Sequence, residues 1–467
     1  MDILVVVVAL ILLMLVAYRG FSVIIFAPVI AMGAVFFSEP SAVFPAYVSL
    51  FMEKAAFFVK TYFPMFLLGA IFGKVIELSG FSRAIVSSIF KLVGAKHAML
   101  AIALVTTVLS YGGVSAFVLV FAVYPFAAEL FRMGQIPKRL IPGVIWLGGV
   151  TYAMDAMPGS PQIQNIIPTS YFDTTAYAAP TLGIIGSIFI LVLGIIYFEW
   201  ARRKAAARGE GYDSGQPLHN EPETFTDEKL PSLWIALIPL FMVGIVNLLM
   251  TKNIINIFGE SYSLQLHGMK ETGPILVDIK KNISLYAVEI ALMAGIFTVF
   301  LLSFKRVVTR FAEGSKAAVS GCLLAIMNTA SEFGYGSIIA VLPGFAILAD
   351  AMHGISNPLL SEVISISTLA GIVGSASGGL TIAMGAMSKI FVDSANAAGI
   401  PLEVAHRVAS MASGAFDSLP HNGAVITLLA VTGLTHRQAY GPIFVVTLIK
   451  TAAVFLVIAL YYLTGLV

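Results

Sequence analysis

Residues 155–165 read Asp155-Ala156-Met157-Pro158-Gly159-Ser160-Pro161-Gln162-Ile163-Gln164-Asn165, an acidic and amide-rich run that proline and glycine break, between strongly apolar flanks. A helix that stops inside a bilayer leaves N–H and C=O groups without partners, and lipid supplies none. Such a break is tolerated only where protein or a water-filled cavity surrounds it. The run therefore predicts a polar site at membrane depth.

The composition predicts a membrane protein with several spans. The chain has 467 residues, of which 58% are hydrophobic and 11% are charged, and its mean hydropathy is +0.94. Soluble domains do not reach these values. The N-terminus enters an apolar segment without the basic region of a secretory signal, so we expect a retained first transmembrane helix. With a net charge of +2 and no basic patch, nucleic acid is not an expected partner.

The opening run recurs later in the chain. Residues 417–423 read Asp417-Ser418-Leu419-Pro420-His421-Asn422-Gly423 and repeat the pattern Asp-x-(Met/Leu)-Pro at an offset of 417 − 155 = 262. The same offset pairs Gly112 with Gly374, Ser115 with Ser377 and Pro180 with Pro442. We therefore predict two copies of one unit, with four parts to the chain: N-terminal transmembrane helices and a loop (1–56), a first repeat (57–204), a polar loop with two connecting transmembrane helices (205–316) and a second repeat (317–467).

Basic residues predict the topology of the two copies. They flank residues 96–130 at both ends, which predicts a re-entrant hairpin whose Gly/Ser tip lies at 110–115. The first copy ends at Arg202-Arg203-Lys204, and two crossings follow, at about 233–250 and 284–303, before the second copy starts. Arg437 fits the resulting orientation, whereas Lys389 and Arg407 fit it less well. The expected fold is an all-α polytopic membrane protein with inverted-topology repeats, each with a re-entrant helical hairpin and a proline-broken transmembrane helix.

Each copy offers a hairpin tip and a proline break to a ligand. Small residues let backbone N–H groups approach a ligand, and the N-termini of half-helices attract anions. The alternative is that these residues only allow close helix packing. The candidate substrate-binding residues are Tyr111, Gly112, Gly113 and Ser115 at the first tip, Pro158, Gly159, Ser160, Gln162, Gln164 and Asn165 in the first break, Ser375, Ser377 and Gly378 at the second tip, and His421, Asn422 and Gly423 in the second break.

The amides in these breaks, Gln162, Gln164, Asn165 and Asn422, have both donors and acceptors. They suit recognition of hydroxyl and carboxylate groups, or else they satisfy the broken backbone itself.

Four titratable residues are candidates for ion coupling. Asp155 and Asp417 are costly at membrane depth and are candidates for that reason, although each could instead cap the half-helix that follows. Glu332 lies in a polar, glycine-rich interruption at 328–337 that has no acidic counterpart in the first copy. It could serve coupling or a packing or ion-pair role. His421 is a candidate because an imidazole ordinarily changes charge near neutral pH, and a hydrogen-bonded structural role is its alternative.

Catalytic and cofactor motifs are not apparent in the sequence. It has no Walker loop, no HExxH motif and no cluster with metal-ligand spacing, and its one cysteine, Cys322, lies in an apolar segment. We expect no cofactor, no metal site and no enzymatic activity.

The sequence resembles the gluconate permease (GntP-type) family of the ion-transporter superfamily over nearly its whole length. The resemblance is carried by NTASEFGYGS at 328–337, GSASGGLTIAMG at 374–385, MPGSPQIQN at 157–165 and DSLPHNGAVITLLAVTGLTH at 417–436. It implies a symporter of the bacterial inner membrane that takes up hydroxy-monocarboxylates such as gluconate or 3-hydroxybutyrate with a proton. It also implies a homodimer and an elevator motion.

Two features of the sequence bear on this expectation. The MPGSPQIQN segment departs from the histidine-proline segment of gluconate carriers, which favours smaller acids such as 3-hydroxybutyrate. The alternative within the superfamily is a sodium-coupled carrier of di- or tricarboxylates, and a channel or an intramembrane enzyme would be a different class.

Overall fold

The computed structural model describes residues 2–19, 21–93, 97–114, 116–213, 220–221, 230–265, 274–345, 347, 355–420 and 422–467. Two of the predicted site residues, Ser115 and His421, lie outside the described residues.

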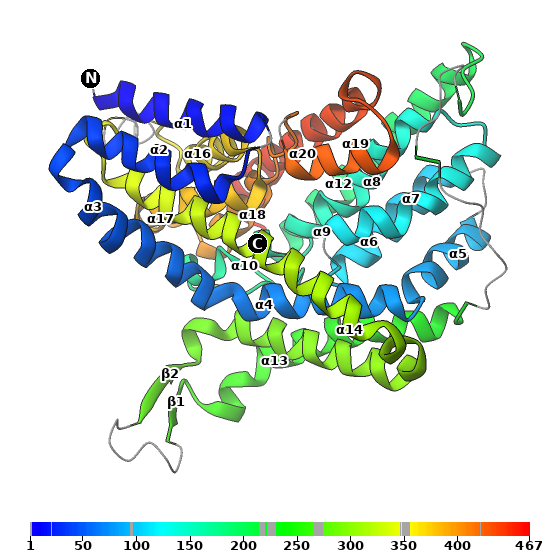
Figure 1. Ribbon diagram of the computed structural model, residues 1–467, viewed down its shortest axis with the longest axis horizontal. Coiled ribbons are helices and arrows are strands. Elements are labelled where there is room, and N and C mark those ends of the chain that lie inside the picture. The colour runs from blue at the N-terminus through cyan, green and yellow to red at the C-terminus, as the bar shows by residue number, and fades with distance from the viewer. Residues whose placement is uncertain are drawn as a thin grey trace.

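The chain begins with helices that pack beside a long helix from its middle. They are α1 (Asp2–Tyr18), α2 (Val23–Ser38) and a nearly unbroken helical segment formed by η1 (Pro40–Ala42), α3 (Val43–Ala46), η2 (Tyr47–Phe51) and α4 (Met52–Leu78). Here α1 packs on α2, and both α2 and α4 pack along α14 (Ile283–Val341), as Figure 1 shows for α4 and α14. Pro64 lies inside α4 without ending it.

The first half of the core is a series of short helices that ends in a long one. It comprises α5 (Phe81–Val93), α6 (Ala98–Tyr111), α7 (Ala116–Met133), η4 (Lys138–Leu140), α8 (Ile141–Gly149), α9 (Tyr152–Asp155), α10 (Ile163–Ile166), α11 (Thr169–Phe172) and α12 (Pro180–Ala206). The helix before the predicted break ends at Asp155, and only two single turns follow before α12 begins. The break predicted at 155–165 is thus a true interruption, and helices α6 and α7 form the predicted hairpin.

The connecting region differs from the prediction in two ways. Between α13 (Leu233–Phe258) and η5 (Lys280–Asn282) the chain forms a two-stranded antiparallel sheet of β1 (Ser261–Leu264) and β2 (Ile275–Asp278), in which Ser261 pairs with Asp278. This hairpin projects from the helical body in Figure 1. The crossing expected at 284–303 does not end but continues as α14, which bends at Ser303, where φ is −141°.

The second half of the core repeats the order of elements in the first half. It comprises α16 (Pro358–Val373), α17 (Ala376–Ala397), α18 (Leu402–Ser413), α19 (Gly423–Thr432) and α20 (His436–Thr464). Helices α6 and α16 end 373 − 111 = 262 residues apart, α8 and α18 begin 402 − 141 = 261 apart, and α4 and α14 end 341 − 78 = 263 apart. The sequence offset therefore recurs in the boundaries of the helices.

The interruption expected at 328–337 is not present, because α14 stays helical throughout this segment. Its glycines serve close packing instead. A methyl group at Gly334 would lie 2.9 Å from the carbonyl oxygen of Phe51, and one at Gly336 would lie 2.9 Å from the side chain of Ile382. The glycines thus allow α14 to approach η2 and α17.

The two halves of the core exchange contacts. Helix α8 of the first half packs on α20 of the second, and α18 of the second packs on α9, α10, α11 and α12 of the first. In the same way α7 packs on α19, while α17 packs on α10 and α11. Each break is therefore enclosed in part by the other half of the chain.

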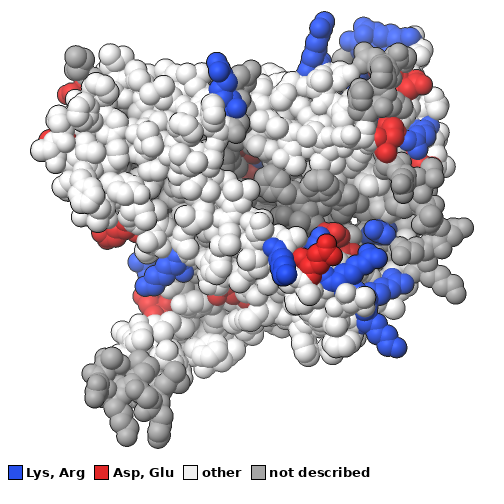
Figure 2. Space-filling model, viewed as in Figure 1, with Lys and Arg blue, Asp and Glu red and all other residues white. Residues whose placement is uncertain are grey.

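The surface of the helical body suits a bilayer. Within the part of the chain that the structure describes, five helical segments are long and apolar enough to cross a membrane: Pro40–Leu78, Pro180–Ala206, Leu233–Phe258, Lys280–Val341 and His436–Thr464. Large apolar side chains on these segments are exposed, among them Ile196, Trp234 and Phe297. Figure 2 shows a broad uncharged area, with lysine, arginine and acidic residues gathered in patches mostly towards its margins. The chain is an all-α membrane protein.

Candidate functional site

The non-helical backbone of the first break is stabilised by hydrogen bonds of its own N–H and hydroxyl groups. Gly159 has a φ of +79°, and its N–H donates to the carbonyl of Ala176 at 2.8 Å. A methyl group at Gly159 would overlap the ring of Tyr177, so both the backbone angle and the space require glycine. Ser160 Oγ donates to the carbonyl of Ala153 at 2.7 Å and so satisfies a carbonyl that the end of α9 leaves free.

The first hairpin tip lies against the first break. The hydroxyl of Tyr111 donates to the carbonyl of Pro158 at 2.9 Å. The amide Nε2 of Gln162 donates to the carbonyls of Ser110, at 2.7 Å, and Val114, at 3.2 Å. Gln162 therefore satisfies the backbone of the tip, which was the alternative to substrate recognition. A methyl group at Gly112 would overlap Leu240, so the tip also packs closely on α13.

Arg407 of α18 binds the first break from the other half of the chain. Its side chain is fully buried. Nη1 donates to Asn165 Oδ1 at 2.9 Å and to the carbonyl of Asp155 at 3.1 Å, and Nη2 donates to the carbonyl of Ala178 at 2.8 Å. Asn165 in turn donates to the carbonyls of Ser160 and Ala176, each at 2.9 Å. Asn165 is thus engaged by the protein, as Gln162 is.

The second break is stabilised by shorter-range contacts. Asn422 caps α19, since its Oδ1 accepts from the N–H of Val425 at 2.9 Å while its Nδ2 donates to the carbonyl of Asp417 at 2.7 Å. Thr451 donates to the carbonyl of Ala415 at 3.0 Å. Among the described residues, no arginine or lysine donates a hydrogen bond to a carbonyl of this break. The predicted Gly423 follows as the first, exposed residue of α19.

The second hairpin tip contacts Glu332. Ser375 caps α17 by accepting from the N–H of Gly378 at 3.1 Å, and its hydroxyl lies 3.4 Å from that of Ser377. A methyl group at Gly378 would overlap the carboxylate of Glu332, so this acid packs directly on the tip. Glu332 is 5% exposed, and its Oε2 has no hydrogen-bond partner among the described residues.

A buried lysine lies between the two breaks. Lys450 Nζ of α20 is 2.5 Å from Asp155 Oδ2, and both side chains are 1% exposed. The two groups form a buried ion pair, and among the described residues neither atom has a further hydrogen-bond partner. Asp417, 4% exposed, is within electrostatic range of both. A methyl group at Gly414 would overlap Lys450 and Asp155, so the glycine at the start of the second break makes this approach possible.

The structure brings the predicted residues together in three groups. The first tip and first break join Tyr111, Gly112, Gly113, Pro158, Gly159, Ser160, Gln162 and Asn165, and the second tip joins Ser375, Ser377 and Gly378 to Glu332. The third group is Asp155 and Asp417 with Lys450. Gln164 belongs to none of these three groups. Its Oε1 is buried and has no hydrogen-bond partner among the described residues.

Sequence reasoning missed three buried charged residues. Arg407 was considered only as a marker of orientation, and Lys450 and Glu362 were not considered. Glu362 of α16 is 1% exposed, and its Oε1 has no hydrogen-bond partner in the described part of the chain. For Lys450 and Glu362 the signal is a charged residue within an apolar segment, which is costly in a membrane unless it has a function or a partner. Arg407 lies in a less apolar helix that also carries Glu403 and His406.

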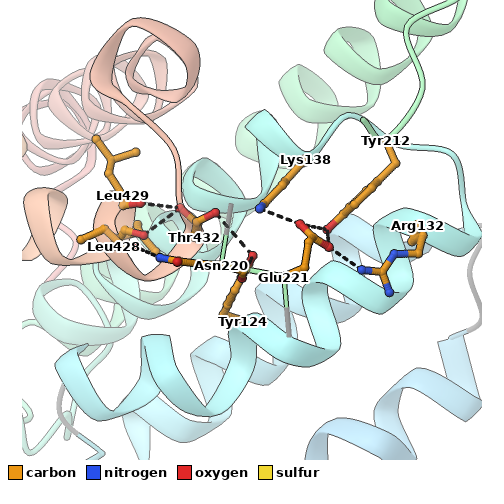
Figure 3. Close-up of polar contacts among 10 residues, drawn as sticks. Tyr124, Arg132, Lys138, Tyr212, Asn220, Glu221, Leu428, Leu429 and Thr432 are labelled. Carbon is orange, nitrogen blue, oxygen red and sulfur yellow. Dashed lines mark hydrogen bonds and ion pairs between the residues drawn. The ribbon is translucent and has the colours of Figure 1, made fainter. Parts of the chain in front are cut away.

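A further polar cluster lies where the loop between the halves meets the core (Figure 3). Glu221 accepts from Lys138 Nζ at 2.7 Å and from the hydroxyl of Tyr212 at 3.1 Å, and it also pairs with Arg132. Partial burial favours the neutral acid, but the hydrogen bonds and charges of Lys138 and Arg132 outweigh it and hold the pKa of Glu221 below its ordinary value. The neighbouring Asn220 donates to the carbonyl of Ala430 at 2.7 Å, which ties the loop to α19.

Broken helices and buried charges inside a membrane-spanning body are features of membrane transporters. No protein-family model matches the chain. The chain is 51% identical over 474 residues to the Bacillus subtilis (strain 168) protein named "Uncharacterized transporter YxjC", and the match covers 100% of both chains. It belongs to the same family as that transporter.

A solved structure supports the fold. The Alcanivorax borkumensis YdaH transporter, described as having an unusual topology, is similar with a TM-score of 0.53 at 12% sequence identity, over 88% of each chain. At this identity the likeness concerns the fold alone.

Proposed function

We propose that the protein is a secondary active symporter that imports a small organic hydroxy-monocarboxylate, of the gluconate or 3-hydroxybutyrate type, together with a proton. The observation that carries the proposal is the pair of helix breaks with buried acids and a buried lysine between them. An anion and a proton are the two charges that such a cluster can exchange. The resemblance to the gluconate permease family supports the class of substrate.

The geometry sharpens the roles of the candidate residues. Gln162, Asn165 and Asn422 use their amides on the backbone, so the free Oε1 of Gln164 is the amide group best suited to accept a hydrogen bond from a substrate hydroxyl. The N–H groups of Gly113 and Gly378 already donate to Ser110 and Ser375, so the two tips would line the substrate site without binding its carboxylate through these groups, with Ser115 as a further candidate. Glu332 is the acid nearest the second tip, and His421 remains a candidate in the second break.

The transport cycle that we propose is an elevator motion between inward-facing and outward-facing states. In this cycle the two halves of the core are inverted repeats with re-entrant hairpins. They move together relative to α14 and the helices that pack along it, α2, α4 and α13. The repeated order of elements and the exchange of contacts between halves support one moving body formed by both. We further propose a homodimer in a bacterial inner membrane, as the family resemblance implies.

Uptake into proteoliposomes tests the proposal. Labelled 3-hydroxybutyrate and gluconate are supplied outside, with and without an inward proton gradient and with and without sodium. We expect accumulation of one or both acids that depends on the proton gradient and not on sodium. Entry of neither acid under any gradient would refute the substrate class. Sodium-dependent uptake of a di- or tricarboxylate, such as succinate or citrate, would instead support the sodium-coupled alternative.

A further inference from the structure

We propose that Lys450 binds the carboxylate of the substrate and that Asp155, its partner in this structure, releases it by taking up the coupled proton. This inference rests on the proposed function and assigns the anion-binding group and the proton-binding group of the same site. It also predicts the number of protons that accompany each substrate molecule.

The position of Lys450 is the first argument. It lies on α20 of the second half, yet it contacts Asp155 at the end of α9 in the first half, 2.5 Å away. Gly414 at the start of the second break packs against both groups. Lys450 is therefore the buried cation at the point where the two breaks meet, which is where an anion held by both halves would lie.

The unfinished hydrogen bonding of the cluster is the second argument. A buried ion pair that serves stability alone is expected to be completed by hydrogen bonds, because the desolvation of both charges is otherwise poorly compensated. Beyond their contact with each other, Asp155 Oδ2 and Lys450 Nζ have no hydrogen-bond partner among the described residues, and Oδ1 of Asp155 and Oδ1 of Asp417 are buried with none. The free carboxylate oxygens are placed to accept a proton, and Lys450 is placed to bind an anion.

The charge balance is the third argument. With both acids ionised, Lys450, Asp155 and Asp417 carry a total charge of 1 − 2 = −1. If one proton binds Asp155 and one carboxylate takes its place beside Lys450, the total is again −1, because the proton and the anion cancel. A constant buried charge avoids the large cost of changing the charge in a medium of low dielectric constant. Movement of one monoanion with one proton is thus electrically neutral.

Asp155 is assigned as the proton acceptor because it is the acid in direct contact with Lys450, and the other titratable groups around it are the following. Arg407, which contacts the backbone of Asp155, already donates to carbonyls and to Asn165. Helices α8 and α10 carry no titratable side chain. In α12 the first titratable side chain after its N-terminus is that of Tyr197. The remaining groups on the elements of the cluster are Tyr152 of α9, Tyr111 of α6, Glu403 and His406 of α18, Asp417 in the second break, His436, Arg437, Tyr440, Tyr461 and Tyr462 of α20, and Lys138 and Arg139 of η4, which are paired with Glu221 and Glu210.

Two measurements on the wild-type protein test the stoichiometry. In proteoliposomes with labelled 3-hydroxybutyrate or gluconate, one proton for each monoanion gives about tenfold accumulation at equilibrium for each unit of pH gradient. A membrane potential imposed with valinomycin and potassium should leave this accumulation unchanged. Accumulation that follows the potential would overturn the inference while leaving the symporter proposal in place. Absence of any uptake would overturn the proposed function, and the inference with it.

Three variants test the residues. Asp155→Asn resembles the protonated acid, so it should retain exchange of labelled for unlabelled substrate and lose accumulation driven by the pH gradient. Lys450→Met should reduce both about 100-fold, in the range seen when one partner of a buried charge pair is removed. The double variant Asp155→Asn/Lys450→Met removes both charges together, so it should recover thermal stability while transport stays lost. The matched control is Lys389→Met, which removes an exposed lysine that pairs with Asp393 and should leave transport unchanged.

The double variant separates this inference from a purely structural ion pair. If the pair only stabilises the fold, removing both charges together should restore transport along with stability, because no unpaired charge remains. Transport by the double variant at the level of the wild-type protein would therefore overturn the inference. Stable protein without transport would support it.

Discussion

The two helix breaks share a sequence register but are stabilised in different ways. At the first break, Arg407 reaches across from the other half and binds the carbonyls of Asp155 and Ala178. At the second break, Asn422, Thr451 and His436 donate to backbone carbonyls from nearby in the same half, His436 Nε2 to that of Pro420 at 2.8 Å. The position that the offset pairs with Arg407 is 407 − 262 = 145, an isoleucine. The repeat therefore preserves the interruption and not the means of stabilising it.

This difference suggests a division of roles between the breaks. Hydrogen bonds from a charged donor are stronger than neutral ones, and a buried carbonyl that loses its donor is destabilised further. The first break is thus the more rigid of the two. The second break supplies Gly414 and Asp417 to the cluster around Lys450, with fewer charged contacts to hold it. Four tests with five substitutions probe this comparison, in order of decreasing effect.

The largest effect is expected from Arg407→Ala. It removes the donors to the carbonyl of Ala178 and to Asn165 Oδ1 and leaves the carbonyl of Asp155 to Ser410 alone. We expect a loss of about 4 kcal/mol or more, by analogy with removing one partner of a buried charged network. The measurement is the yield of monodisperse protein in detergent and its melting temperature. Arg437→Ala, at an exposed arginine of α20, is the control. A variant as stable as the control would show that the first break does not depend on the hydrogen bonds of Arg407.

Asp417→Asn should have the next largest effect, and on transport more than on stability. With one acid removed, Lys450 is attracted to Asp155 alone and pairs with it more tightly. We expect the apparent affinity for substrate to fall about tenfold, with the pH of maximal uptake moving to lower values. Uptake measured between pH 5 and 8 checks both. A variant that fails to fold would favour a capping role for Asp417 instead.

Gln162→Ala and Asn422→Ala form a matched pair across the two breaks. Each removes an amide that satisfies backbone groups, so each should lower the free energy of unfolding by about 1 kcal/mol. Since Arg407 holds the first break independently, we expect the Gln162 variant to lose less activity than the Asn422 variant. Thermal unfolding and uptake of the two variants side by side provide the test. A greater loss of activity at Gln162 would reverse our ranking of the breaks.

The smallest effect is expected at Glu221, whose neighbour Asn220 ties the loop to α19 beyond the second break. Because the pKa of Glu221 is lower in the folded protein, its contribution to stability is present above the unfolded pKa of about 4.3 and is lost as the pH falls through the folded value. Glu221→Gln should therefore lower the free energy of unfolding at pH 7 by about 1 kcal/mol or less. This appears as a slightly lower melting temperature. The difference from the wild-type protein should disappear at acidic pH. A difference that persists unchanged at low pH would show that the charge of Glu221 is not its cause.

Much of the architecture could be predicted from the sequence, because prolines, glycines and the offset of 262 are local signals. The break at 155–165, the hairpins at 98–133 and 358–397 and the order of helices follow from them. The interruption predicted from the glycines at 328–337 was wrong, because Gly334 and Gly336 allow close packing of a continuous helix. Glycine alone does not distinguish a helix end from a close helix contact.

The charged core of the site could not be predicted from the repeat. Arg407 and Lys450 pair in register with Ile145 and Ile188, since 450 − 262 = 188, so the comparison of the two copies contains no trace of them. Their partners lie in the other half of the chain, and that contact depends on how the halves pack. A search for single charges in apolar segments would have found Lys450 without finding what it binds, whereas Arg407 lies in a helix that also carries Glu403 and His406.

The reach of Arg407 across the two halves has a consequence for how the protein is made. Arg407 is synthesised 407 − 155 = 252 residues after Asp155, which at about 5–20 residues per second is a delay on the order of tens of seconds. During that time the first half lies in the membrane with its break incomplete. We therefore expect the nascent first half to be the stage at which membrane insertases and proteases act. A chain stopped before residue 400 should be cleaved near residue 160, where the full-length protein resists.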